Sequence, residues 1–244
     1  MKIFTVWALV VILTTSWVPD SLGQEPLTYQ AKYSARAVGM SATAERKLES
    51  MGNSRYLLTQ SMTVRVLGAT LGQILETSQF THRDGNLLPE MYRYLQTGIS
   101  KREEEVEFDW NQHVAVSSDK DNQWQLAITP GILDKLSFQL HLRETLANEE
   151  VREMEIRMVD ASEIETHLYR VTGAEAVETG LGVLDCIKVE RIREPGSARR
   201  TTFWLARDWD LLLVKFEQTS GSGSETSLLL EEAVIAGQVV IPSP

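Results

Sequence analysis

The sequence contains one cysteine, Cys186, among 244 residues, so the chain cannot form an internal disulfide. A chain of this length builds a core of normal size without covalent cross-links. A lone thiol is more often a small buried apolar residue than a reactive group. We therefore expect Cys186 to be buried.

Signatures of catalysis and of metal binding are also missing. The four histidines, His82, His113, His141 and His167, are not at metal-ligand spacing and no cysteine accompanies them. A zinc site needs three or four converging ligands. The sequence has no nucleophile elbow, phosphate-binding loop or dinucleotide fingerprint. It therefore predicts no catalytic residues, no metal and no cofactor, which favours a non-enzymatic protein.

One acidic residue does not fit a simple solvated face. Glu76 falls between Ile74 and Phe80 on one face of a predicted strand. Acid–base catalysis needs two carboxylates in different environments, and a single inward carboxylate does not supply them. A structural partner such as an arginine is the favoured explanation, and a carboxylate-dependent hydrolase is the least favoured function.

Long apolar runs are absent, apart from residues 3–13 near the amino terminus. A membrane-spanning helix needs about 20 apolar residues, and this run has about half of them. Lys2 precedes the run, and Ser21-Leu22-Gly23 presents small residues at the positions that a signal peptidase reads. The sequence predicts a cleaved signal peptide over residues 1–23 and one β-rich domain over residues 24–244, without a transmembrane segment in the mature chain.

Excess positive charge is missing as well, because the formal net charge is −10. Removal of residues 1–23 takes away one basic and one acidic side chain, Lys2 and Asp20, so the charge is unchanged. Such a charge opposes binding to nucleic acid and to anionic lipid surfaces. The expected partners are neutral or basic.

What the sequence does contain is apolar alternation of period two, the pattern of half-buried strands. In residues 29–37 the odd positions are Tyr or Ala, and the even positions are polar. Turn signals such as Asp84-Gly85-Asn86 separate such stretches. The predicted strands are 29–37, 56–65, 73–81, 91–96, 105–110, 124–128, 154–159, 164–171, 183–192, 201–206, 211–218 and 227–235.

These strands predict a mainly β fold, either a large curved antiparallel sheet or a half-open barrel, with one or a few helices. Residues 132–146 are ambiguous between helix and strand, and their length favours a helix. On a helix their apolar arc is wider than a surface stripe, which indicates burial on more than one side. We take Leu133, Leu136 and Leu140 on this arc as candidate ligand-binding residues.

Three motifs carry a resemblance to a known family. They are Leu-Asp-Lys-Leu-Ser at 133–137 with Leu142-Arg143, Thr-Gly-Leu-Gly-Val-Leu-Asp at 179–185, and Phe-Trp-Leu-Ala-Arg-Asp at 203–208. Together they resemble the DUF3108 family of exported bacterial proteins of unknown function, over about residues 29–237. The resemblance implies a periplasmic location and no catalytic residues. The strand-rich pattern is also similar to that of periplasmic lipoprotein carriers of the LolA kind, which enclose an apolar cavity.

These observations favour a non-enzymatic periplasmic protein that binds an apolar ligand, such as a lipid, or an envelope partner. A curved sheet with one broadly apolar helix forms a pocket of the kind found in barrel mouths. The alternative is an interaction or scaffold protein with a filled core, acting through an exposed face or a sheet edge.

Overall fold

The computed structural model describes residues 25–37 and 39–242, so the predicted signal peptide lies outside the described residues. All the described strands belong to one sheet. The first eight, each antiparallel to the next, are β1 (Tyr29–Ala37), β2 (Met40–Gly52), β3 (Arg55–Val66), β4 (Ala69–Arg83), β5 (Asn86–Gly98), β6 (Arg102–Asp109), β7 (Val114–Asp119) and β8 (Asn122–Ala127).

The second half of the chain repeats this up-and-down arrangement after one short helix. Among the described strands, only the pairing of β9 with β10 is parallel. The elements are β9 (Ile132–Leu133), α1 (Phe138–Leu146), β10 (Glu153–Asp160), β11 (Glu163–Thr179), β12 (Gly182–Ile192), β13 (Arg200–Ala206), β14 (Leu212–Thr219), β15 (Glu225–Ile235) and β16 (Gln238–Val239).

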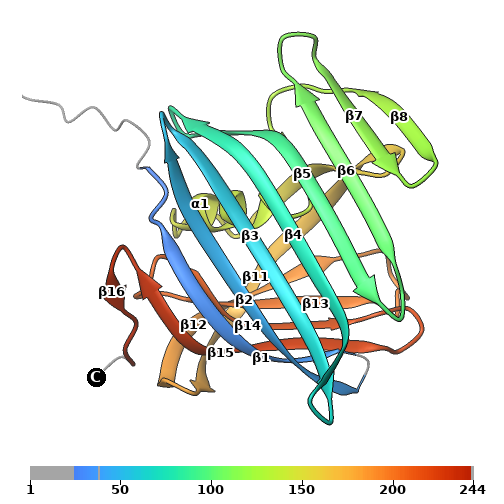
Figure 1. The fold of residues 1–244 in the computed structure, drawn as a ribbon. Helices are drawn as coiled ribbons and strands as arrows, with labels where there is room; N and C mark the ends of the chain where they lie inside the picture. Colours follow the sequence, from blue (N-terminus) through green and yellow to red (C-terminus); the bar gives the residue numbers. More distant parts are fainter. Residues whose placement is uncertain (1–24, 38, 243–244) are drawn as a thin grey trace, which may run out of the picture.

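The two halves are joined where β1 pairs with β15, which gives the order β8 to β1 followed by β15 to β9. The sheet curls, so that β9 comes close to β5. In the described residues β8 and β9 are the two edge strands of the sheet, and they do not pair with each other. Figure 1 shows the two halves as crossing walls with α1 between them. Register shifts in β1, β4 and β11 mark bulges, which bend strands and increase their twist. The predicted curved, half-open β fold is confirmed.

Alternation explains the strands that the sequence predicted. In β1 the side chains of Tyr29, Ala31, Tyr33 and Ala35 are buried, while those between them are exposed. Two full strands, β2 and β7, were not among the predicted stretches. The inward face of β2 reads Ala42, Ala44, Arg46, Leu48, so it has one large apolar residue and is interrupted by a charge.

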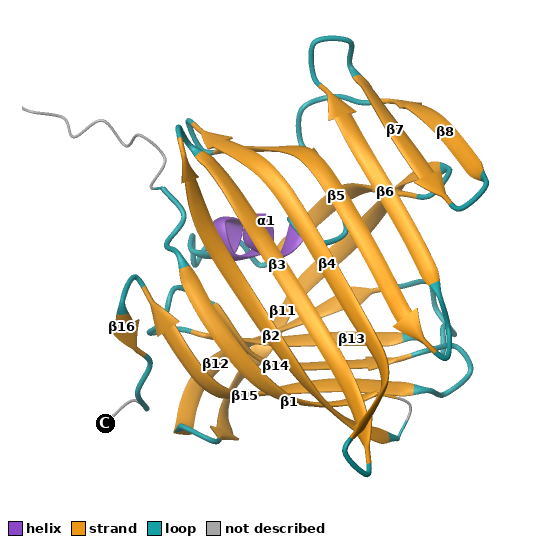
Figure 2. Cartoon of the chain, viewed as in Figure 1, coloured by secondary structure: helices purple, strands orange, loops and turns teal. Residues whose placement is uncertain are grey.

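Residues 132–146 divide between both predicted alternatives. Ile132 and Leu133 form the short strand β9, and α1 begins only at Phe138. Figure 2 shows α1 in purple among the orange strands. The helix prediction was wrong for its first part because the Asp134 carboxylate accepts the backbone N–H groups of Leu136 and Ser137, at 2.8 and 2.7 Å. Side-chain bonds of this kind form a turn in place of helix.

Candidate ligand-binding cavity

The curl encloses a cavity of about 580 Å³. Its walls come from β2–β4 on one side and β10–β15 on the other, and the start of α1 closes one end. This volume lies within the range of about 300–1,000 Å³ that is usual for small-molecule sites. The cavity is therefore the principal candidate site.

One wall of the cavity is aromatic. Phe138 of α1 stacks on Tyr169 of β11 with ring centroids 5.7 Å apart, and Phe203 of β13 lies edge-on to both at 6.4 and 6.1 Å. Phe216 of β14 continues the cluster at 5.2 Å from Phe203. Aromatic side chains provide large rigid apolar surfaces, so this wall suits the apolar part of a ligand.

The opposite wall carries a row of polar side chains on neighbouring strands. Arg46, Gln60 and Glu76 are cross-strand partners in β2, β3 and β4. Arg46 Nη2 donates to Gln60 Oε1, and Gln60 Nε2 donates to Glu76 Oε1 at 3.2 Å. Tyr92 donates its hydroxyl to the other Glu76 oxygen at 3.0 Å. The sequence predicted a structural partner for Glu76, such as an arginine, and the direct partners are an amide and a phenol.

The charges in this row are not balanced by direct ion pairs. Arg46 is 6% exposed, and its Nε has no hydrogen-bond partner among the described residues. Burial raises the pKa of Glu76, although the Tyr92 hydrogen bond and nearby Arg46 act in the opposite direction. Burial therefore disfavours the charged form of the Glu76 carboxyl, which Gln60 separates from Arg46.

The rim of the cavity is charged but internally paired. Lys135 Nζ lies 2.6 Å from Glu104 and 2.7 Å from Asp160. Burial acts to lower the pKa of Lys135, but the hydrogen bonds to Asp160 and Glu104 raise it above its usual value. His167 and Arg191 share Glu165, at 2.5 and 3.5 Å. Burial lowers the pKa of His167, against the effect of that carboxylate.

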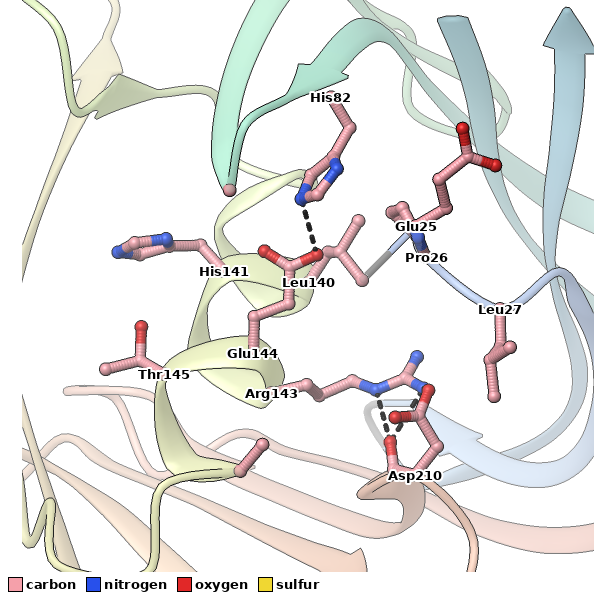
Figure 3. A pocket seen from close by; sticks show the side chains of 12 residues that line it. Glu25, Pro26, Leu27, His82, Leu140, His141, Arg143, Glu144, Thr145 and Asp210 are labelled. Atoms are coloured by element: carbon pink, nitrogen blue, oxygen red, sulfur yellow. Dashed lines mark hydrogen bonds and ion pairs between the residues drawn. The ribbon is translucent and has the colours of Figure 1, made fainter. Parts of the chain in front are cut away.

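A second hollow, of about 350 Å³, lies between segment 25–27 and α1 (Figure 3). His82 Nε2 is 3.1 Å from Glu144, and Arg143 donates to the Asp210 carbonyl and carboxylate at 2.7–3.0 Å. The Arg143 guanidinium also lies 4.9 Å from the centre of the Tyr29 ring. These charged side chains already have protein partners, and among its described lining residues there is no serine or cysteine.

The residues of the first family-like motif attach α1 to the sheet. Asp134 is fully buried and accepts a 2.6 Å hydrogen bond from Ser78 of β4, besides its two backbone bonds. Arg143, its trailing arginine, is held by Asp210 in the turn between β13 and β14. Both roles are structural, because each side chain links the helix to one wall of the curl.

The candidate residues Leu133, Leu136 and Leu140 are all buried, at 5% exposure or less. Leu140 borders the smaller hollow, whereas Leu133 and Leu136 line neither hollow. Their role in ligand binding stays a prediction. Cys186 is buried as predicted. Sequence reasoning missed Arg46, although a lone arginine between Ala44 and Leu48 was the available signal.

A metal-binding cluster and a membrane-spanning helix are both absent from the described residues. No group of three or more His, Cys, Asp or Glu side chains in residues 25–37 and 39–242 is arranged to hold a metal ion. Within the same ranges, no helix is both long and apolar enough to cross a membrane.

A solved structure supports the fold. The chain is similar to a β-barrel-like protein of the DUF1849 domain family from Brucella abortus, with 13% identity, a TM-score of 0.55, and coverage of 86% of this chain and 98% of that one. A "putative lipoprotein" from Parabacteroides distasonis aligns with 13% identity over 86% and 96% of the two chains, at a TM-score of 0.33. Comparison with the curated proteins finds no match.

A family model gives the assignment. The model described as "Protein of unknown function (DUF3108)" matches residues 28–230, which include the curl, the helix and all three motifs. The chain therefore belongs to the DUF3108 family.

Proposed function

We propose that the protein is exported to the periplasm and acts without catalysis, by holding an apolar ligand inside the curl of its sheet. The observation that carries this proposal is the cavity of about 580 Å³ with its aromatic wall. A filled interior would leave no room for a ligand, so the cavity favours ligand binding over a scaffold protein with a filled core.

The cavity volume limits the size of the ligand. If each heavy atom of an aliphatic chain occupies about the volume of one water, roughly 30 Å³, the cavity holds on the order of 20 such atoms. This capacity suits a single acyl chain. In this proposal the acyl chain of the ligand lies against Phe138, Tyr169 and Phe203.

An uncharged fluorescent probe, N-phenylnaphthylamine, tests the proposal without involving any charge in the cavity. Met62 of β3 lines the cavity, so Met62→Trp fills part of it. Its neighbour Ser61 lies on the other face of the strand and lines a different surface hollow, so Ser61→Trp is the matched control. We expect the probe to bind the wild type and the control, with its affinity reduced about ten-fold or more in Met62→Trp.

Native mass spectrometry of protein from the periplasm, purified without delipidation, supplies an independent measurement. An apolar small molecule retained by the wild type and lost in Met62→Trp is the expected result. Equal probe affinity for all three proteins, or no binding by the wild type, would overturn the proposal and leave the interaction protein in first place.

A further inference from the structure

A buried guanidinium with an unused donor lies in the wall of the cavity. Arg46 is 6% exposed, its Nε lacks a hydrogen-bond partner among the described residues, and the side chain borders the cavity. Buried charges in proteins are paired or neutralised, because an isolated ion away from water is strongly disfavoured. Arginine cannot lose its proton under ordinary conditions, so it needs an anion.

The protein's own carboxylates do not supply this anion directly. Arg46 forms none of the ion pairs found within 4.0 Å among the described residues. Gln60 stands between Arg46 and Glu76, and it accepts from one and donates to the other. Glu104 and Asp160 are already held by Lys135, and Glu165 by His167 and Arg191. These carboxylates leave Arg46 without a direct anionic partner, which a bound anion would supply.

The two walls of the cavity thus differ in chemistry. The aromatic cluster of Phe138, Tyr169, Phe203 and Phe216 provides apolar surface, and the row that begins with Arg46 provides a charge and hydrogen-bond donors across from it. We propose that the ligand is a single-chain amphiphile whose anionic headgroup, a carboxylate or a phosphate, binds the guanidinium of Arg46. This inference rests on the proposed function, because it names the ligand class of the same cavity.

Three ligands with the same chain of sixteen carbons separate charge from apolarity: hexadecanoate, hexadecyl phosphate and hexadecanol. Each is titrated as a competitor of N-phenylnaphthylamine bound to the wild type. A charge-assisted hydrogen bond in a buried site strengthens binding by about ten-fold or more. We expect at least one of the two anions to bind about ten-fold more tightly than hexadecanol. The anion that binds more tightly identifies a carboxylate or a phosphate as the natural headgroup.

Variants of Arg46 assign this preference to one side chain. Arg46→Met and Arg46→Gln remove the charge, and we expect the preference for the anion to fall below about three-fold while hexadecanol binding persists. Arg46→Lys keeps the charge and should retain most of the preference. Arg36→Gln, at an exposed position on neighbouring β1, is the control for net charge and should change nothing.

Thermal stability gives a readout that a purely structural arginine would not produce. If the Arg46 guanidinium lacks an anionic partner in the ligand-free protein, Arg46→Met should raise the melting temperature of that protein. The variant should also abolish the rise in melting temperature that hexadecanoate gives in the wild type. Equal wild-type affinity for hexadecanol and both anions overturns the inference, as does an unchanged preference in Arg46→Met. In both cases N-phenylnaphthylamine binding to the wild type would leave the proposed function standing.

Discussion

Asp134 offers the sharpest test of how α1 is held in the curl. Its fully buried carboxylate accepts the N–H groups of Leu136 and Ser137 on one oxygen and the Ser78 hydroxyl on the other. Asp134→Ala removes the acceptor for all three donors. Asp134→Asn keeps one carbonyl oxygen for the two N–H groups, and its amide donates to the Ser78 oxygen, which accepts as well as donates.

The expected loss follows from the number of donors left without a partner. Each buried unsatisfied donor costs about 1–3 kcal/mol. The two backbone N–H groups cannot turn away, so Asp134→Ala should lower the free energy of unfolding by about 2–6 kcal/mol. The Ser78 hydroxyl is free to rotate, so its loss is not included in this range. Asp134→Asn should cost about 1 kcal/mol, the worth of one exchanged hydrogen bond.

Equilibrium urea unfolding, followed by tryptophan fluorescence, measures the free energy of unfolding of both variants. At roughly 2–4 °C per kcal/mol for a chain of this size, the melting temperature of Asp134→Ala should drop by about 10 °C. Ser137→Ala keeps the Asp134 carboxylate and its backbone bonds but loses a 3.3 Å bond from the Asp134 N–H, so it serves as the control and should cost about 1 kcal/mol. Equal losses for Asp134→Asn and Asp134→Ala would refute the reasoning, because geometry would then matter less than charge.

Three further predictions concern single side chains. Burial raises the pKa of Glu76 above 4.5, so the contribution of Glu76 to stability is full below that pH and is lost as pH rises through the folded-state pKa. Urea titrations should therefore show that the stability of Glu76→Gln, relative to the wild type, improves from low to neutral pH. Burial raises the pKa of the Cys186 thiol to about 12, so a thiol reagent should label the native protein slowly and the unfolded protein fast, and equal rates would contradict this. Leu140→Ala should lower the free energy of unfolding by about 2–5 kcal/mol if Leu140 is tightly packed, whereas a smaller loss together with altered uptake of a fluorescent fatty-acid analogue would assign Leu140 to a ligand site.

The strands that the sequence predicted well are those with one wholly apolar face. In β1 every second side chain from Tyr29 to Ala35 is buried, and the predicted bounds agree with the structure. The bounds of α1 were predicted less well, because the Asp134 carboxylate accepts the backbone N–H groups of Leu136 and Ser137 and so forms a turn in place of helix. The other carboxylate oxygen is held by Ser78, 56 positions away, and no local pattern reports a contact of that range.

The failure at β2 has a different physical origin, and it coincides with the candidate site. A strand is recognised by apolar residues on its inward face, and a strand that lines a polar wall lacks them. Arg46 stands where a core residue would fit the pattern, and Gln60 and Glu76 occupy the same register on the next two strands. Each of these residues lowers the apolar signal of its strand, and Arg46, a buried charge without a direct ion pair, costs stability when the cavity is empty. Sequences depart from local consistency chiefly at functional or strained positions. A row of three such departures on adjacent strands, facing an aromatic wall, is difficult to reconcile with a core that only stabilises the fold, and it favours a cavity that recognises a charged group.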